Sequence, residues 1–359
     1  MKLQKIGELK LLQEIRKRFK TEDNGIILGI GDDAAVLVPQ KENLLVTTDM
    51  MNEGIHFDLS FTSPFQLGFK LVSINVSDIM AMGGRPKYIF LNVALKSDAD
   101  EDIFWDMYEG ISKAMEMYSV KLAGGDLCAA KNDMVLSATV IGAAEKFITR
   151  SGAKAGDKIY ITGTLGDSAC GLALLQRLTD ESKEIVNRIG APGYRRICEK
   201  LYLRYHDTPT LRYIDFDTVE PLITRHLTPV ARDSSEVAKY ATSMIDVSDG
   251  LFIDLCRICD ESNVGAKVYL DRIQISDEAK NAAEIMGLDP MRLAVSGGED
   301  YELLFTAPAE NNFKFQISNL KSQKITCIGE IMETDRIAVD KTGKKFPIKA
   351  EGYQHFGAP

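Results

Sequence analysis

Aspartates recur at the ends of apolar runs in this chain, each time next to small or hydroxyl residues. The five runs are IILGIGDD (Asp32, Asp33), LLVTTD (Asp49), LVSINVSD (Asp78), VKLAGGD (Asp126) and SMIDVSD (Asp246, Asp249). A single aspartate in this setting is ordinary turn and capping chemistry. Five such runs in one chain favour a shared chemical purpose. Oxygen-only ligands, with the hydroxyls of Thr47 and Thr48 beside Asp49, suit Mg²⁺ or Mn²⁺ rather than zinc.

Asp78 is the most informative of these acids. It belongs to SPFQLGFKLVSINVSDIMAMGG, where helical spacing predicts a helix that Ser63 caps and Gly83 stops. Only Lys70 and Asp78 are charged in this segment, so the helix is expected to be buried. Converging carboxylates repel each other by about 4 kcal/mol per pair at 4 Å and an effective dielectric near 20. The acids therefore predict bound cations. Because Mg²⁺ completes its shell with water and substrate phosphates, they also predict nucleotide chemistry.

The usual phosphate-binding motifs are absent from the sequence. There is no G-x-x-x-x-G-K-[ST] motif and no kinase H-R-D or D-F-G pattern. A phosphate donor is therefore expected to be held by the backbone of Gly124 and Gly125 and by one arginine. Arg150 in TRSGAKAGD is the candidate, and a surface residue at a domain junction is its alternative interpretation. The stretch GIGDDAAVL imitates a dinucleotide-binding turn, but its two acids and the following strand-like AAVLV argue against one.

Length and composition limit the class of protein. At 359 residues the chain predicts two domains, residues 1–150 and 151–359. No apolar run approaches the roughly 20 residues that span a bilayer, which excludes a membrane protein. The N-terminus does not resemble a secretion signal, so we expect a cytoplasmic location. A net charge of −9 argues against nucleic acid as a partner.

Strand-like and helix-like segments alternate through both halves, which predicts an α/β and α+β architecture. Residues from about 178 to 220 are polar and charge-rich, and we predict a helical insertion there. Cys256 and Cys259 form a C-x-x-C pair inside a helix-like run. We interpret them as core thiols one turn apart. A redox or zinc site is the alternative, but a second C-x-x-C is missing.

Several motifs together carry a family resemblance. GIGDDAAVL, TTDM with EGIHF, NVSDIMAMGGRP, LAGGD, TRSGAKAGD, DVSDGL and SGGEDYELLFT, in this order, resemble the thiamine-monophosphate kinase family of the PurM-like ATP-binding superfamily. The resemblance implies ATP-dependent phosphorylation of thiamine monophosphate to thiamine diphosphate with several Mg²⁺ ions. It also implies a homodimer. The N-terminal domain would form a β-barrel across the dimer, next to an α+β C-terminal domain. The 178–220 segment is longer than the family's usual connection.

The resemblance also implies roles for individual residues. Metal-binding positions match Asp33, Thr47, Thr48, Asp49, Asp78, Asp126, Asp246 and Asp249, with Asp32 as a supporting residue. ATP-contacting positions match Gly125, Asp126, Arg150 and Ser248, with Tyr108 on the adenine side. Asp33, Asp78, Asp126 and Arg150 would be catalytic, and His56, Glu299 and Tyr353 would bind the substrate.

Some of these assignments have alternatives. Glu299 could balance the thiazolium charge, whereas His56 could be a structural histidine and Tyr353 could anchor the C-terminal tail. Other functions also remain open. One is an aminoimidazole-ribonucleotide or selenophosphate synthetase, although no cysteine precedes Cys128, as a selenophosphate synthetase would need. Another is a non-enzymatic scaffold stabilised by metal or nucleotide, which the retention of every acid disfavours.

Overall fold

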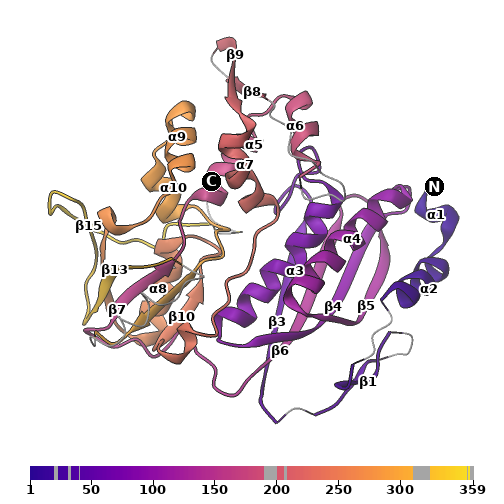
Figure 1. The fold of residues 1–359 in the computed structure, drawn as a ribbon, viewed down its shortest axis with the longest axis horizontal. Helices are drawn as coiled ribbons and strands as arrows, with labels where there is room; N and C mark the ends of the chain where they lie inside the picture. The colour runs from indigo at the N-terminus through magenta and orange to yellow at the C-terminus, as the bar shows by residue number, and fades with distance from the viewer. Residues whose placement is uncertain are drawn as a thin grey trace. The chain divides into compact units, whose positions relative to one another are not determined.

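The computed structural model describes residues 1–19, 23–30, 34–39, 41–189, 200–205, 208–309, 324–353 and 355. The chain forms two compact units (Figure 1). Unit 1 comprises residues 1–80, 84–146 and 183–196, and unit 2 comprises residues 81–83, 147–182 and 197–359. Within the described ranges, none of the helices has both the length and the apolar character needed to cross a membrane.

Unit 1 is built on a four-stranded sheet with strand order β3-β6-β4-β5. β6 pairs antiparallel with β3 and β4, and β4 pairs parallel with β5. A separate antiparallel pair, β1 and β2, precedes it. The elements are α1 (Leu3–Ile6), α2 (Glu8–Arg18), β1 (Ile26–Leu28), β2 (Val36–Leu37), β3 (Asn43–Asn52), α3 (Pro64–Ala81), β4 (Arg85–Lys96), α4 (Glu101–Tyr118), β5 (Lys121–Ala130) and β6 (Val135–Ala144).

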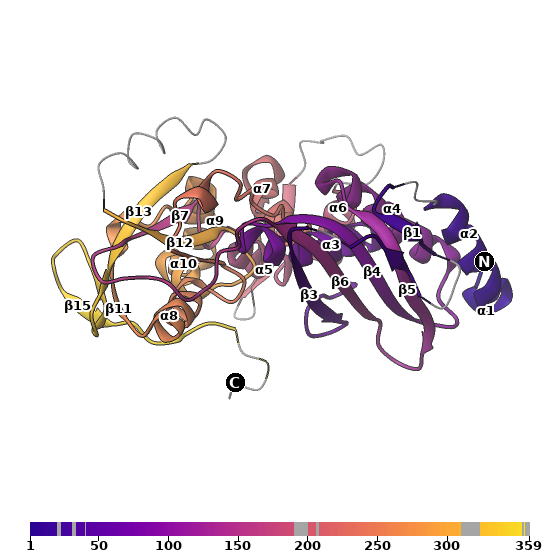
Figure 2. The ribbon, with the colours of Figure 1, turned by 90° about the horizontal axis from the view of Figure 1, so that it is seen from below.

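Helices α3 and α4 lie side by side on one face of this sheet (Figures 1 and 2). The predicted helix start is confirmed, because the Gln66 N–H donates to Ser63 Oγ at 3.3 Å. The Ser63 N–H donates in return to Gln66 Oε1 at 2.9 Å, which completes a capping box. A side chain on Gly68 or Gly110 would collide with the backbone of the other helix. These two glycines therefore let α3 and α4 pack in direct backbone contact.

The opposite face of the sheet carries apolar side chains that no described element covers. Along β3, Leu45 and Met51 are buried under the helices, at 7% and 1% exposure. Their neighbours Leu44, Val46 and Met50 point the other way and are 57%, 65% and 56% exposed. Successive strand residues alternate between the faces of a sheet. β3 is thus apolar on both sides, while only one side is covered.

Unit 2 is built on a seven-stranded sheet with order β10-β12-β7-β13-β11-β14-β15. Its pairs are antiparallel except β11 with β14. The sheet strands are β7 (Lys158–Thr162), β10 (Ser243–Asp246), β11 (Gly265–Tyr269), β12 (Leu303–Ala307), β13 (Ile325–Met332), β14 (Arg336–Val339) and β15 (Lys345–Pro347). The helices are α5 (Asp167–Leu175), α7 (Phe216–Leu227), η1 (Val237–Lys239), α8 (Leu251–Ser262), η2 (Leu270–Arg272), α9 (Asp277–Met286) and α10 (Pro290–Ser296).

The central strand β7 is buried on both faces. Ile159 and Ile161 join the core that includes Leu255 of α8. Tyr160 points to the other face, where its ring stacks on Phe305 with centroids 5.3 Å apart. Burial on both faces explains why this strand is a continuous apolar run without polar alternation.

Cys256 and Cys259 face the core on α8, with exposures of 4% and 0%. Burial raises the pKa of the Cys259 thiol to about 12 and also raises that of Cys256. A thiol with a raised pKa is a weak nucleophile and a poor metal ligand at neutral pH. The interpretation of the C-x-x-C pair as core thiols is confirmed.

The prediction of a helical insertion at 178–220 is wrong in part. α6 (Asp180–Val186) is a helix that spans the division between the units, but β8 (Lys200–Tyr205) and β9 (Thr208–Asp215) form an antiparallel hairpin. In β8, Leu201 and Leu203 are buried while Tyr202 is exposed. This period of two is the signal of a strand. The density of charged residues in the segment concealed it.

Candidate active site

One group of predicted ligands in unit 1 gathers between β3 and α3. Thr47 Oγ1 donates to Asp78 Oδ2 at 2.5 Å. The Asp49 N–H donates to Oδ1 of Asn75 at 3.0 Å, and Asn75 precedes Asp78 by about one helical turn. Asp78 is half-buried and has a hydroxyl partner. The structure therefore brings Thr47, Asp49 and Asp78 to the same side of the sheet.

A second group lies on the open face of the same sheet. The Thr48 side chain points to the opposite face of β3 from Thr47 and Asp49. Its Oγ1 donates to Ala138 O of β6 at 3.0 Å. Asp126 is exposed and stands opposite Asn92, an exposed residue of β4. Strand alternation thus divides the predicted ligands of unit 1 into two groups, one of Thr47, Asp49 and Asp78 and one of Thr48 and Asp126.

Asp32 and Asp33 lie outside the described residues, so their assignments stay predictions. In the ranges that the structure describes, no group of three or more His, Cys, Asp or Glu side chains is arranged to hold a metal ion. Mg²⁺ is usually held by one or two carboxylates and completes its shell with water and substrate phosphates. Asp49 and Asp78, which lie on the same side of the sheet, fit that mode better than a closed protein cage.

Three of the residues predicted to contact ATP differ in their burial and packing. Gly125 has φ 151°, and a side chain there would collide with the Leu91 carbonyl of β4, so the position requires glycine. Arg150 is exposed. Tyr108 is only 5% exposed, and its ring packs on Phe104 with centroids 4.7 Å apart. This burial favours a packing role for Tyr108, and its contact with adenine stays a prediction.

In unit 2, a tight turn follows β10 and holds further predicted ligands. Asp246, at the end of the strand, is 3% exposed. Asp254 Oδ2 accepts from the N–H groups of three consecutive residues beginning at Ser248, at 3.1–3.2 Å. Arg257 bridges Asp254 and Asp249 at 2.5 and 2.6 Å. Burial raises the pKa of Asp254 to about 6, against the opposing effect of Arg257. Sequence reasoning missed Asp254 and Arg257.

Two of the predicted substrate residues meet this turn. The Glu299 N–H donates to Ser248 O at 2.8 Å, and the Tyr353 N–H donates to Asp249 O at 3.0 Å. Tyr353 therefore anchors the tail through its backbone, while the residue stays 45% exposed. Glu299 has φ 64°, a left-handed conformation that costs about 1 kcal/mol or more in a residue with a side chain. Such strain is typical of functional sites.

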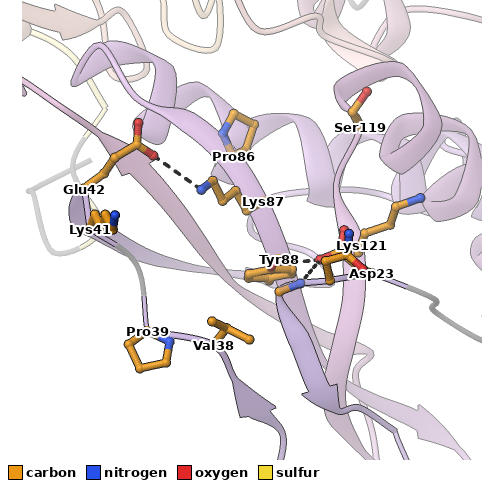
Figure 3. A pocket seen from close by; sticks show the side chains of 12 residues that line it. Asp23, Val38, Pro39, Lys41, Glu42, Pro86, Lys87, Tyr88, Ser119 and Lys121 are labelled. Atoms are coloured by element: carbon orange, nitrogen blue, oxygen red, sulfur yellow. Dashed lines mark hydrogen bonds and ion pairs between the residues drawn. The ribbon is translucent and has the colours of Figure 1, made fainter.

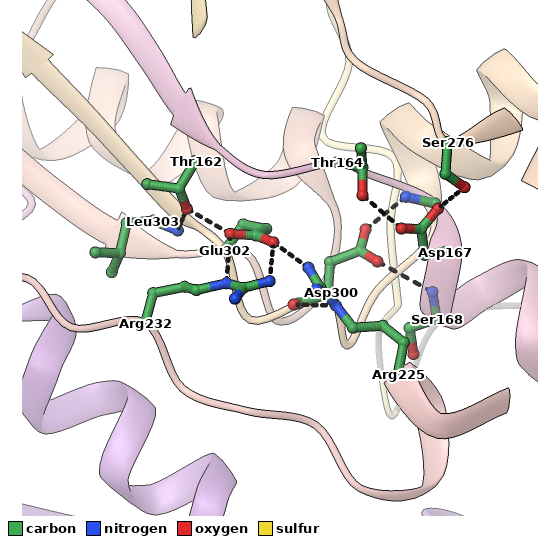
Figure 4. Close-up of polar contacts among 11 residues, drawn as sticks. Thr162, Thr164, Asp167, Ser168, Arg225, Arg232, Ser276, Asp300, Glu302 and Leu303 are labelled. Atoms are coloured by element: carbon green, nitrogen blue, oxygen red, sulfur yellow. Dashed lines mark hydrogen bonds and ion pairs between the residues drawn. The ribbon is translucent and has the colours of Figure 1, made fainter. Parts of the chain in front are cut away.

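Asp300 begins a buried network behind Glu299 that sequence reasoning missed (Figure 4). Asp300 is 1% exposed, and its carboxylate accepts from Gly166 N at 2.6 Å and Ser168 N at 3.1 Å. Both N–H groups belong to the start of α5, where backbone donors lack helical partners. Burial raises the pKa of the Asp300 carboxyl to about 7, and the positive charge of Arg225 acts in the opposite direction.

Glu302 continues this network and is completely buried. Arg225 forms an ion pair with it, and Arg232 donates from Nε to Glu302 Oε2 at 2.8 Å. Thr162 Oγ1 donates to Oε2 at 2.5 Å (Figure 4). Burial acts to raise the pKa of Glu302, but the two guanidinium charges outweigh it and leave the pKa lowered. The pairing meets the requirement that a buried charge has partners.

His56 has a structural contact in unit 1. Its Nδ1 accepts from the Asn52 N–H at 3.0 Å, which assigns the ring proton of a neutral imidazole to Nε2. The ring is half-buried beside the turn that follows β3. A contact between Nε2–H and a substrate stays a prediction.

A cavity of about 610 Å³ in unit 1 lies elsewhere (Figure 3). The residues that line it include Asp23, Tyr88 and the exposed Lys121. Asp23 Oδ1 accepts from the hydroxyl of Tyr88 at 3.1 Å and from Gly25 N at 2.7 Å. Its lining contains none of the residues predicted to bind ATP, metal or substrate.

Comparisons with known proteins identify the family of the chain. The family model of AIR synthase related protein, N-terminal domain, matches residues 31–144, and that of the C-terminal domain matches residues 154–341. A thiamine-monophosphate kinase from Aquifex aeolicus is 33% identical over 359 residues, which covers 99% of this chain and 100% of the relative.

Solved structures give the same result. A thiamine-monophosphate kinase from Stenotrophomonas maltophilia K279a aligns with a TM-score of 0.73 and 33% identity, over 91% of this chain and 95% of that one. A structure described as AaThiL complexed with AMPPCP and TMP aligns with a TM-score of 0.69 and 31% identity, over 99% of both chains. The predicted two-domain PurM-like fold is confirmed. This chain therefore belongs to the AIR-synthase-related, PurM-like proteins and, among them, to the thiamine-monophosphate kinase family.

Proposed function

We propose that this chain is an ATP-dependent thiamine-monophosphate kinase. It transfers the γ-phosphoryl group of ATP to the phosphate of thiamine monophosphate and releases thiamine diphosphate and ADP. The observation that carries this proposal is the similarity to thiamine-monophosphate kinases along almost the whole chain. A relative that aligns over 99% of both chains was solved with AMPPCP, an ATP analogue, and TMP.

The chemistry requires positioning more than proton transfer. A phosphate acceptor is already ionised at neutral pH, so the chain needs no general base to activate it. Donor and acceptor phosphates are both anions, and their repulsion must be offset before they can approach. The backbone at Gly125 and the exposed guanidinium of Arg150 are the groups that we assign to the donor phosphates.

The oxygen ligands of both units fit Mg²⁺. Asp78 is aligned by the Thr47 hydroxyl, and Asp249 is aligned by Arg257, so these carboxylates are held in place before any ion binds. The carboxylates assigned to Mg²⁺ are Asp33, Asp49, Asp78, Asp126, Asp246 and Asp249. Mg²⁺ held there would neutralise phosphate charge during transfer.

The substrate side is assigned to the turn after β10. Glu299 offers a carboxylate to the positively charged thiazolium ring, and the exposed ring of Tyr353 offers a flat surface for stacking. Both residues are bonded through their backbones to the same turn, at Ser248 and Asp249. The groups assigned to the cationic ring are therefore bonded to the turn that holds Ser248, which is assigned to ATP, and Asp249, which is assigned to the metal.

We also propose a homodimer through the open face of the unit 1 sheet. Leu44, Val46 and Met50 form an apolar row there, which is unfavourable in water. A second copy of this chain brings an identical apolar row, so pairing of the two sheets would bury both. The resemblance to PurM-like dimers, which form a β-barrel across their two-fold axis, supports the same partner.

The test uses purified protein with ATP, Mg²⁺ and thiamine monophosphate, and follows thiamine diphosphate by chromatography. We expect stoichiometric ADP and thiamine diphosphate, no product when EDTA removes Mg²⁺, and no product when unphosphorylated thiamine replaces the acceptor. Binding of ATP without formation of thiamine diphosphate would overturn the proposal.

A further inference from the structure

Glu299 lies in a loop whose backbone conformation must be held by something outside it. Glu299 and Tyr301 have φ values of 64° and 51°, the left-handed region that residues with side chains avoid. Asp300 lies between them. Such a conformation persists only where surrounding contacts over-determine it. The contacts around this loop therefore indicate what sets the direction of the Glu299 carboxylate.

The main chain of the loop is paired with the turn after β10. The Glu299 N–H donates to Ser248 O at 2.8 Å, and the Tyr301 N–H donates to Val247 O at 2.9 Å. The Val247 N–H donates back to Glu302 O at 2.8 Å. These bonds fix one side of the loop.

Helix α7 fixes the other side through Arg225. Its Nε donates to the backbone oxygen of Asp300 at 3.1 Å, and its guanidinium also pairs with Glu302 (Figure 4). Arg225 thus holds both the main chain next to Glu299 and the buried side chain that follows. The Asp300 carboxylate, bonded to Gly166 N and Ser168 N, ties the same loop to α5.

The next residue of α7, His226, contacts the Glu299 side chain itself. Nδ1 of His226 is 3.1 Å from Glu299 Oε2 and 3.1 Å from Ser168 Oγ. A carboxylate can only accept, so Nδ1 carries the proton between the two side chains. The His226 ring is 5% exposed, which leaves it little freedom to turn away. Two consecutive α7 residues therefore hold this loop, Arg225 through the backbone oxygen of Asp300 and His226 through the carboxylate of Glu299.

We propose that Arg225 and His226 are positioning residues that orient Glu299 toward the cationic ring of thiamine monophosphate, an inference that rests on the proposed function. Neither residue is among those assigned to ATP or to the reacting phosphates. Their effect is confined to recognition of the ring. Loss of either contact lets the carboxylate leave its strained orientation, which weakens binding of thiamine monophosphate and leaves binding of ATP unchanged.

The first experiment compares His226→Leu with His226→Asn. Leucine removes the donor, whereas the asparagine amide places an N–H near the position of Nδ1. We expect His226→Leu to raise the KM for thiamine monophosphate about 10- to 100-fold, the size of a lost hydrogen bond to a charged group. The KM for ATP stays within about twofold, and His226→Asn recovers most of the loss. A parallel rise in both KM values would overturn the proposal.

A double-mutant cycle tests whether His226 acts through Glu299. His226→Leu is made in the wild type and in Glu299→Gln, and the KM for thiamine monophosphate is measured for all four proteins. We expect the effect of His226→Leu to disappear once Glu299 has lost its charge. An equal effect in both backgrounds contradicts positioning through Glu299.

Amide hydrogen exchange gives a readout that does not need kinase activity. Arg225→Lys keeps a positive charge beside Glu302 but lacks the Nε–H that reaches Asp300 O. We expect it to speed exchange in residues 297–302 at least about threefold. Ser182→Ala is the matched control, because it removes a buried hydroxyl that accepts from Tyr202 N at 2.8 Å in the same unit, away from the loop. It should leave exchange in residues 297–302 unchanged.

These experiments separate two kinds of failure. If the wild type makes no thiamine diphosphate, the proposed function fails, and the exchange data alone decide whether α7 holds the loop. If the wild type is active but Arg225→Lys leaves exchange unchanged, or His226→Leu leaves the KM for thiamine monophosphate unchanged, the positioning proposal is wrong while the proposed function stands.

Discussion

The surroundings of Asp78 support its assignment as a metal ligand. Its carboxylate lies on a helix in which Lys70 is the only other charged residue, and it accepts from Thr47 of the neighbouring strand at 2.5 Å. That bond aligns the carboxylate without neutralising its charge. A half-buried carboxylate beside a threonine hydroxyl offers the oxygen ligands that Mg²⁺ prefers. Asp78 therefore carries the metal assignment of unit 1 most directly.

The substitution Asp78→Asn separates charge from shape. Asparagine can still accept the Thr47 hydroxyl, so we expect a thermal midpoint within a few degrees of the wild type. Loss of the charge should weaken Mg²⁺-dependent ATP binding and lower kcat/KM on the order of 100-fold. Calorimetric titration of ATP with and without Mg²⁺, together with the chromatographic assay of thiamine diphosphate, measures both effects. Normal activity would remove Asp78 from the metal site.

The cysteines provide a test of the core at the same scale. Cys259 is completely buried with its pKa raised to about 12, and Cys256 has a raised pKa as well, whereas Cys128 is exposed. Because the thiolate is the reactive form, we expect iodoacetamide at pH 8 to label Cys128 in the native protein at least tenfold faster than Cys256 or Cys259. Peptide mass spectrometry reads the labelling, and urea-unfolded protein is the control. Rapid native labelling of Cys256 or Cys259 contradicts their burial.

At the scale of elements, α3 owes its start to side chains as much as to its apolar face. Ser63 and Gln66 form a reciprocal capping box. Gln66 Nε2 also donates to the carbonyls of Val186 and Ile189, at the end of α6, at 2.8 and 3.0 Å. One completely buried amide therefore serves both the start of α3 and the end of α6.

Substitutions of Ser63 and Gln66 should lower the free energy of unfolding by different amounts. Ser63→Ala removes one cap and is expected to cost about 1 kcal/mol of unfolding free energy. Gln66→Leu also leaves two buried carbonyls without their partner, so its cost should be larger, roughly 2–4 kcal/mol. Urea unfolding measures both, with the exposed Ser60→Ala as a control near zero. Equal costs for the two variants would show that the α6 contacts contribute nothing.

At the scale of the whole molecule, the open face of the unit 1 sheet bears on assembly. The β3 residues Leu44, Val46 and Met50 are more than half exposed. An exposed apolar row on a sheet is a site for association. The proposed occupant is a second copy of this chain.

Val46→Lys tests the dimer, because it places a charge at the centre of the row. In the isolated chain Val46 is 65% exposed, so folding should be unaffected. An unpaired charge buried in an interface costs several kcal/mol, and we expect the dissociation constant to rise at least about 100-fold. Light scattering after size exclusion reports the mass, and Val230→Lys, at a 40% exposed apolar position in unit 2, is the matched control. A monomeric wild type at micromolar concentration would contradict the dimer.

Local pattern was enough for much of the chain. Helical spacing and the Ser63 cap predicted α3. Motifs in a fixed order predicted the family. The 178–220 segment was predicted less well. Its many charged residues concealed the short alternation of buried and exposed residues that is typical of the β8–β9 hairpin.

The sequence by itself determined the family, the start of α3 and the inventory of acids, because these depend on residue identity and spacing along the chain. Only the tertiary structure decided that α3 packs on the face of the sheet that carries Thr47, while no described element covers the face that carries Thr48. It alone also brought Arg225 and Asp300, 75 residues apart, into contact. Such contacts depend on which elements pack together. No local pattern records them, because each partner is an ordinary charged residue in its own segment.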